Sequence, residues 1–292
     1  MKKDLDYIDK IKELALVGLV SDDTLMETLV LKGGNAMSLA HGIGSRSSYD
    51  LDLSMEGDFK EDLEKVKKRM ERALSTTFFD AGYQLFDFQF QLKPKKVAEN
   101  IVDFWGGYEV NFKIIDVARY DDLKGNPDNL RRNALSLSPD NSTKFSIDIS
   151  KYEYVQGKIQ KQLGGYTFSV YSLEMIVLEK VRAICQQLPE YAEIVKSSTQ
   201  RNRARDFYDI YTILEQFDID IQSISFKQIL RAIFDVKRVP HDYLKKMKNH
   251  KAIHEKGFVS VKDTISASER QGLKDFDFYF DYVISKFETI LD

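Results

Sequence analysis

The sequence predicts a mixed α/β fold of the α+β kind, in which a sheet with flanking helices is followed by an all-helical lobe. Three observations support this prediction. A glycine-led turn at residues 33–34 joins two apolar segments near the N-terminus. Further along, apolar and polar residues alternate as they do in half-buried strands. From Ser172 onward apolar residues recur at helical spacing, so we expect domains at residues 1–171 and 172–292.

The first half is expected to begin with a helix over residues 4–20, where apolar residues recur at helical spacing. Residues 30–53 then predict a buried strand, the glycine turn, a short helix over 35–41, a loop and a second strand. The composition of residues 60–77 is strongly helical.

Several later segments of the first half show the alternation of half-buried strands. These segments are residues 86–92, 108–117 and 145–149, and a further candidate strand runs over residues 166–171. Glycine, proline and many Asp and Asn residues predict that 121–142 is mostly loop.

The second half is predicted to contain helices only. They are expected at residues 172–187, 203–216, 226–235, 240–249 and 268–291. Ligands favour clefts between such lobes, so the boundary near residue 171 is the expected place for a site.

Composition excludes several classes of protein. The net charge of the 292 residues is -3, so any nucleic-acid contact must come from a local basic patch. The single cysteine, Cys185, excludes a disulfide framework and a cysteine-based zinc site. We find no apolar run of about 18 residues and no signal peptide. A cytoplasmic protein without a membrane span is therefore expected.

Asp50 and Asp52 are the first candidate site residues. On a strand, positions i and i+2 point to the same face, and two like charges held together are costly without a cation between them. The upstream Gly33-Gly34 turn leads into a helix, where backbone amides suit an anion. These features predict a divalent-metal site facing a phosphate site. The alternative is a solvated edge strand with two exposed acids.

A third carboxylate is expected from a neighbouring strand, because two-metal sites commonly use one. Asp148 is the first candidate, since it lies on the polar face of an apolar strand. Asp116, at the end of the 108–117 strand, is a rival for the same position. Either residue could instead be an ordinary exposed acid.

The second half offers a lysine and an acidic cluster. Lys180 lies on an otherwise apolar helix side, where it either extends to solvent or contacts a triphosphate as a point charge. Asp206 and Asp209 share a helical face. They could position a base or hydroxyl across the cleft from Asp50, or form an ion-paired helix start with Arg203 and Arg205.

Basic residues concentrate between positions 227 and 256. This stretch could track a nucleic-acid backbone. A solvated helical surface is the alternative explanation.

Four motifs, in order along the chain, resemble those of the AbiEii/AbiGii toxin family, which are nucleotidyltransferase-like toxins of bacterial toxin–antitoxin and abortive-infection systems. The motifs are Lys32-Gly33-Gly34-Asn35-Ala36-Met37, Arg46-x-Ser48-x-Asp50-Leu51-Asp52, Glu179-Lys180-Val181-Arg182-Ala183 and Arg203-x-Arg205-Asp206-x-x-Asp209. The resemblance implies a polymerase-β-like nucleotidyltransferase sheet and a helical lobe.

The resemblance also implies roles for the motif residues. Mg²⁺, or Mn²⁺ in its place, would be held by Asp50 and Asp52. A third metal ligand stays open: Asp148 fits best by strand pattern, and the alternative is a site with two acids. Asp50, Asp52, Lys180 and Asp206 would be the catalytic residues. The residues expected to border the nucleotide are Lys32, Gly33, Gly34, Asn35, Arg46, Ser48, Arg205 and Asp209.

The implied activity is transfer of a nucleotide from an NTP to an RNA acceptor. Some relatives modify the 3′ acceptor end of tRNA, which halts growth, and an antitoxin encoded nearby would be the partner. The turn is Gly-Gly where the wider superfamily often has Gly-Ser, and Asn35 stands where many relatives have threonine. The identity of the NTP therefore stays open. The alternatives are a small-molecule or protein hydroxyl as acceptor, and a nucleotide-binding module without turnover.

Overall fold

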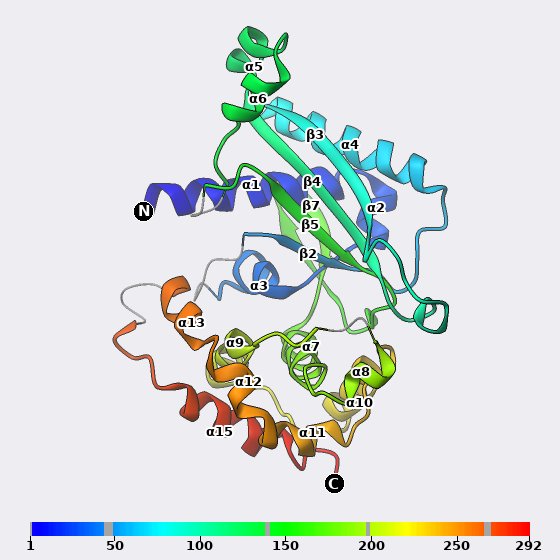
Figure 1. Ribbon diagram of the computed structural model, residues 1–292, viewed down its shortest axis with the longest axis vertical. Helices are drawn as coiled ribbons and strands as arrows, with labels where there is room; N and C mark the ends of the chain where they lie inside the picture. The colour runs from blue at the N-terminus through cyan, green and yellow to red at the C-terminus, as the bar shows by residue number, and fades with distance from the viewer. Residues whose placement is uncertain (1, 44–48, 138–140, 197–198, 266–269) are drawn as a thin grey trace.

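One mixed sheet and two groups of helices make up the computed structural model of the chain (Figure 1). The structure describes residues 2–43, 49–137, 141–196, 199–265 and 270–292. In Figure 1 the sheet and the long helices α1 and α4 form the upper part, and the helices from α7 to α15 form the lower part. Among the described residues, we find no helix with the length and apolar character needed to cross a bilayer.

The sheet has seven strands in the order β3-β4-β5-β2-β1-β7-β6. The strands are β1 Val30–Leu31, β2 Leu51–Ser54, β3 Tyr83–Lys93, β4 Gly107–Asp116, β5 Phe145–Ser150, β6 Ile159–Leu163 and β7 Tyr166–Val170. Strands β2 and β5 are parallel, as are β1 and β7, and the other neighbours are antiparallel. The predicted α/β class with a mixed sheet is confirmed.

Helices of the first half flank this sheet. They are α1 Lys2–Val20, α2 Asp23–Thr28, α3 Gly33–Asn35, η1 Ala36–Ala40, α4 Leu63–Asp80, η2 Glu99–Ile101, α5 Val117–Leu123 and α6 Pro127–Arg132. Asp62 caps the start of helix α4, and its carboxylate accepts hydrogen bonds from two first-turn amides. Its buried residues Val66, Met70, Leu74 and Phe78 are spaced four apart and form one apolar side.

The elements after β7 are helices. They are α7 Leu173–Cys185, α8 Tyr191–Ile194, α9 Ala204–Gln216, α10 Ile224–Asp235, α11 Tyr243–Lys246, η3 Met247–His250, α12 Lys251–Glu255, α13 Phe258–Thr264 and α15 Phe276–Phe287. Helix α7 starts where the sequence predicts, with the Ser172 hydroxyl accepting a hydrogen bond from the Met175 amide. Most of α7 is buried, because α9 and α10 both pack against it.

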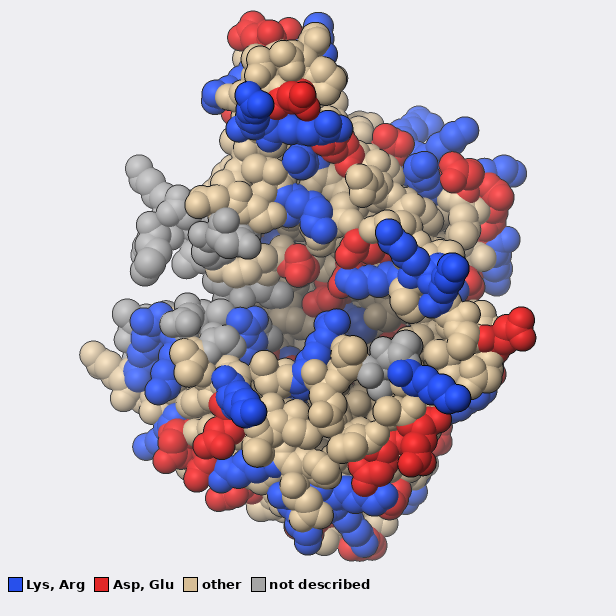
Figure 2. All heavy atoms as spheres, in the orientation of Figure 1, with Lys and Arg blue, Asp and Glu red and all other residues tan. Residues whose placement is uncertain are grey.

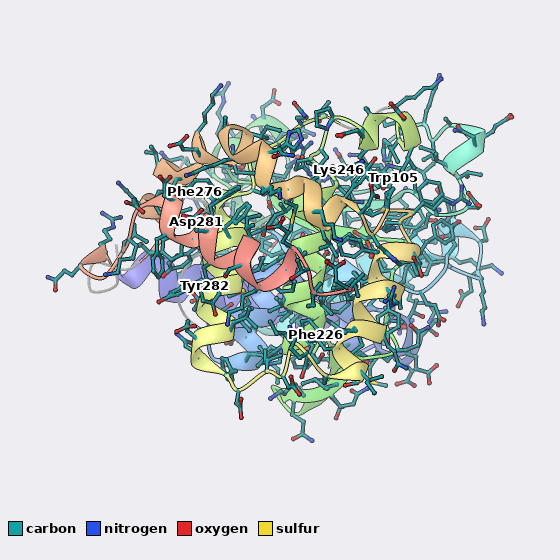
Figure 3. All side chains as sticks on the ribbon, turned by 90° about the horizontal axis from the view of Figure 1, so that it is seen from below. Trp105, Phe226, Lys246, Phe276, Asp281 and Tyr282 are labelled. Carbon is teal, nitrogen blue, oxygen red and sulfur yellow. The ribbon has the colours of Figure 1, made fainter. Side chains whose placement is uncertain are left out.

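Aromatic side chains fix α9 in place. Figure 3 shows the helical part from below, with Phe276 and Tyr282 on α15. The ring of Phe276 lies 5.4 Å from that of Phe207, and the ring of Tyr282 lies 5.0 Å from that of Tyr211. Such edge-to-face pairs add to the burial of apolar area. Because α9 also packs on α7, this layer determines where the acids of α9 lie.

Local structure differs from expectation at three places. Within residues 121–142, which were expected to be mostly loop, α5 extends to Leu123 and Pro127 starts the short helix α6, where proline suits the first helical turn. Strand β6 was not expected, since its exposed Gln and Lys residues do not alternate with apolar ones. The expected helix at 240–249 is divided into α11 and η3.

Two further boundaries differ from expectation. The C-terminal helix begins only at Phe276, behind the capping carboxylate of Asp275. The short helix after the glycine turn already begins at Gly33 and continues as a π-helical turn to Ala40. The division into two domains at residue 171 stays a prediction.

Candidate active site

A cleft of about 460 Å³ lies between the sheet and the helical half of the chain. Figure 2 shows the surface hollowed there, with basic side chains on both rims and acidic ones on the upper wall. We call Gly33, Gly34, Asp52 and Asp148 the sheet wall, and Glu179, Lys180, Arg182 and Asp206 the helical wall. The two motif groups that are far apart in the sequence therefore face one cleft.

The glycine turn and Asp52 are in contact. Gly33 has a φ of +67°, which side chains other than glycine rarely adopt. A Cβ atom at Gly33 would lie 2.6 Å from Oδ2 of Asp52, so the close approach requires glycine. The amide of Lys32 donates to the Asp52 carbonyl at 2.9 Å and fixes the level of the turn on β2. The predicted proximity of turn and acid is present.

A row of carboxylates crosses the sheet at the level of Asp52. Asp52 pairs in register with Asp148 on β5, and Asp148 pairs with Glu109 on β4. Burial raises the pKa of Asp52 to about 6; Lys32 opposes this shift, and the nearby Glu179, Asp148 and Asp50 add to it. Asp52 thus sits where a negative charge is costly without a cation.

Asp50 does not lie on the strand that was expected to carry both acids. Strand β2 begins at Leu51, so Asp50 precedes the strand, and it is exposed and does not line the cleft. The buried Asn35 side chain donates a hydrogen bond to the Asp50 carbonyl at 2.5 Å. Asn35 thus positions the backbone of the acidic segment and does not itself line the cleft.

The structure separates the two candidates for a third carboxylate. Asp148 is beside Asp52 and lines the cleft. Asp116 pairs with Tyr83 at the other end of β4 and precedes α5. Only Asp148 is therefore close enough to share a site with Asp52.

The helical wall holds its charges in pairs. Lys180 is buried and donates to Asp206 at 3.0 Å and to Asp209 at 2.7 Å. The expectation of a lysine extended to solvent is wrong, because two carboxylates of α9 hold the ammonium group inside. Arg203 lies 3.6 Å from Asp206, as an ion-paired helix start requires. Of these acids, only Asp206 lines the cleft; Asp209 is fully buried behind it.

Three expected site residues need separate comment. Arg205 is partly buried and does not line the cleft, whereas Arg203 does. Arg46 and Ser48 lie outside the described residues.

Sequence patterns did not reveal a buried charged cluster at the inner end of the cleft. We call it the inner cluster; it consists of Lys32, Glu153, Glu179, Arg182 and Lys237. Lys32 lies 2.9 Å from Glu179, Arg182 lies 2.7 Å from Glu153, and Lys237 lies 3.4 Å from Glu153. The spacing of Glu179 and Arg182 on α7 was a usable signal. Glu153 and Lys237 come from loops and carried none.

Electrostatics explains how the inner cluster tolerates burial. Burial alone would raise the pKa of Glu153, but Arg182, Lys237 and Lys32 lower it far below its usual range. Burial lowers the pKa of Lys237 to about 8; Glu153 opposes this shift, and Arg182 and Lys32 add to it. The lysine also donates to the carbonyls of Lys151 and Phe104. Three cations around two carboxylates leave positive charge facing the cleft.

The donor set of the sheet wall suits an oxygen-preferring cation. Among the residues that the structure describes, none donates a hydrogen bond to the carboxylates of Asp50 and Asp52 or forms an ion pair with them. The described residues contain no ready-made cluster of three His, Cys, Asp or Glu side chains that could hold a metal ion. Two open carboxylates, each with a pKa raised chiefly by burial, nevertheless fit Mg²⁺ or Mn²⁺ chemically.

Ion pairs occupy much of the basic stretch at residues 227–256. Lys237 is buried in the inner cluster. Five other cations have carboxylate partners. These pairs are Arg238–Asp103, Lys245–Asp292, Lys246–Asp242, Lys248–Glu288 and Lys251–Asp277. The stretch is thus less available to a phosphate backbone than its composition indicates.

Comparison with known proteins identifies the family. Two solved structures show distant similarity: JHP933 from Helicobacter pylori (16% identity, 99% of this chain, 92% of that chain, TM-score 0.49) and an antigenic nucleotidyltransferase-like protein from Paracoccidioides brasiliensis (13%, 90%, 97%, 0.36). Comparison with curated proteins gave no match. A family model described as "Nucleotidyl transferase AbiEii toxin, Type IV TA system" matches residues 14–282. The chain therefore belongs to the AbiEii nucleotidyltransferase toxin family of type IV toxin–antitoxin systems.

Proposed function

We propose that this protein transfers a nucleotide from an NTP, bound with Mg²⁺, to an RNA hydroxyl at the 3′ end of tRNA. One observation carries the proposal. The open carboxylate of Asp52, in contact with the Gly33 turn, faces the Lys180–Asp206 pair across a single cleft. Family membership supports the transferase activity.

The sheet wall would bind the phosphates and the cation. Gly33 and Gly34 line the cleft at the start of the helical segment that runs to Ala40. The first amides of such a segment have no helical acceptors, so they would be available to phosphate oxygens. Asp50 and Asp52 would hold Mg²⁺, or Mn²⁺ in its place. When bound, the cation supplies charge neutralisation for the carboxylates and the nucleotide phosphates.

The helical wall and the inner cluster would supply the remaining positive charge. Lys180 is held in one position by two carboxylates, so it loses little further entropy when a phosphate approaches. Arg182 and Lys237 line the same cleft and are similarly fixed. Asp206 keeps its place at the cleft surface through Lys180. These contacts favour a preorganised site for a triphosphate.

The reaction needs no covalent intermediate with the protein. The acceptor hydroxyl loses its proton to solvent as its oxygen forms a bond to the α-phosphorus, the bond from that phosphorus to the β-phosphate oxygen breaks, and pyrophosphate leaves. The protein contributes positioning and charge complementarity, which are the main sources of rate in phosphoryl chemistry. The arrangement of charges on both walls suits this task.

The acceptor would enter the cleft from its open side, between the sheet and the helices (Figure 2). The ion pairs of residues 227–256 and the net charge of -3 favour the alternative, a small-molecule or protein hydroxyl. We place the protein in the cytoplasm, where both NTPs and RNA are present. As a type IV toxin, the protein has an antitoxin partner, which we propose is encoded nearby.

A label-transfer experiment tests the proposed function. The protein is incubated with each α-³²P-labelled NTP, Mg²⁺ and total RNA, and the RNA, protein and small-molecule fractions are separated. We expect label in the tRNA band with the wild type and none with Asp52→Asn. Label only in another fraction would identify the alternative acceptor. If the wild type labels no fraction and binds no Mg²⁺–NTP, the proposal is wrong.

A further inference from the structure

Lys93 lies across the acidic row of the sheet wall. It is the last residue of β3, and its ammonium group is 2.7 Å from both carboxylate oxygens of Asp148. The same group donates to Glu109 at 3.1 Å. Lys93 also lines the cleft. A single cation therefore already bridges two neighbouring carboxylates of the row.

Glu109 holds Lys93 in this position. Its carboxylate accepts hydrogen bonds from Gln91 at 2.8 Å and from Asn111 at 2.7 Å, besides the one from Lys93. Burial would raise the pKa of Glu109, but these three donors lower it to about 2. The carboxylate is thus ionised across the working range of pH. It provides a permanent negative anchor for the ammonium group of Lys93.

Asp148 and Asp52 differ in what faces them. They are register partners on adjacent parallel strands. Lys93 takes both oxygens of Asp148, whereas no described residue donates to the side chain of Asp52. The acidic row is thus divided into an open part at Asp52, with Asp50 just before the strand, and a part closed by lysine at Asp148 and Glu109.

We propose that the ammonium group of Lys93 acts as a fixed monovalent cation of the site. It occupies the carboxylate of Asp148, so that only Asp50 and Asp52 are left to bind a divalent cation, and they bind one. This inference rests on the proposed function, because it concerns the cation of the same site. Lys93 does for Asp148 and Glu109 what a second metal ion would do: it lies between two like charges and reduces their repulsion. A second divalent cation would have to displace the ammonium group and break its three short contacts.

Binding of Mn²⁺ alone tests the inference without any need for turnover. Mn²⁺ is titrated into the wild type, Lys93→Ala, Lys93→Arg and the double variant Lys93→Ala with Asp148→Asn. Lys96→Ala is the control, because it removes an exposed lysine from the loop after Lys93. Calorimetry and the electron paramagnetic resonance signal of free Mn²⁺ give the number of ions bound and their affinity. Thermal melting confirms that each variant is folded.

We expect one Mn²⁺ per wild-type chain. Lys93→Ala should bind a second ion, or bind the first at least about tenfold more tightly, because a cation next to the site has been removed. Lys93→Arg and Lys96→Ala should bind Mn²⁺ as the wild type does. The double variant should show neither the second ion nor the tighter binding of Lys93→Ala.

Two results would overturn the inference. One is a wild type that binds two ions; the other is a Lys93→Ala variant with unchanged number and affinity. In both cases the proposed function survives, provided that Asp52→Asn abolishes binding. If the wild type binds no Mn²⁺ at all, the inference and the metal site of the proposed function both fail.

Discussion

The sheet wall and the helical wall of the cleft hold their charges in opposite ways. On the sheet wall, Asp52 has a raised pKa, and no described residue donates to its side chain. On the helical wall, Lys180 is buried between Asp206 and Asp209. A buried acid without a charged partner destabilises the ligand-free protein, and its carboxylate is available to bind a ligand. A fully paired lysine supports the fold, and removal of it leaves buried charges behind. Removal of a charged group should therefore stabilise the ligand-free protein on the sheet wall and destabilise it on the helical wall.

The largest expected effect is on activity at the sheet wall. Asp52→Asn should lower label transfer by about 10³-fold or more, because a neutral amide cannot neutralise and position the cation. The folded protein should be retained. Asp116→Asn is the matched control, since this acid is exposed at the far end of β4. A comparable loss in the control, or full activity in Asp52→Asn, would contradict the assignment of the sheet wall.

The helical wall should respond in stability as well. Lys180→Ala should lower the free energy of unfolding by about 3–5 kcal/mol, because it removes the ammonium group that lies within 3.0 Å of two buried carboxylates. Urea unfolding monitored by circular dichroism measures the change. An unfolding curve identical to that of the wild type would show that the pair contributes nothing to the fold.

The pH dependence should report Asp52. Its pKa of about 6 predicts that Mn²⁺ affinity falls about tenfold per pH unit below 6, because only the ionised carboxylate binds the cation. The effect on stability has the opposite sign. The folded protein holds this proton more tightly than the unfolded chain does, so the metal-free protein gains stability as pH falls through 6. Mn²⁺ affinity that is constant from pH 7 to 5 would contradict the raised pKa.

The smallest effect is expected on the outer surface. Lys248→Ala removes an exposed ion pair with Glu288 and should change the free energy of unfolding by less than about 1 kcal/mol. Its effect on the apparent affinity for RNA distinguishes the two explanations of residues 227–256. A loss of affinity that disappears at high salt supports a phosphate contact, and no loss supports a solvated surface.

Local patterns were sufficient for much of the fold and half of the cleft. Residue alternation in the sequence found β3, β4 and β5, and a strand was also expected where β7 lies. Only β5 shows the matching alternation of buried and half-buried positions. The glycine turn located Asp52, since both lie within one short segment. Strand β6 was not predicted, because it is an exposed edge strand in which polar and apolar residues do not alternate.

The remaining half of the site depends on contacts that are distant in sequence. Lys93, Glu153 and Lys237 reach the cleft through pairs separated by many residues, such as Lys93 with Asp148. A lone lysine or glutamate in a loop carries no local signal of such a partner. Likewise, Lys180 was recognised, but its burial between two acids of α9 depends on how two helices pack.

The melting temperature of the wild type and Asp52→Asn, with and without Mg²⁺–ATP, tests most directly whether the sheet wall is an open cation and nucleotide site. Without ligand, we expect Asp52→Asn to be more stable than the wild type by about 1–2 kcal/mol, because a costly buried charge is removed. With saturating Mg²⁺–ATP, the order should reverse, because only the wild type gains binding energy. A variant that is less stable without ligand, or that gains as much as the wild type from Mg²⁺–ATP, would contradict the account.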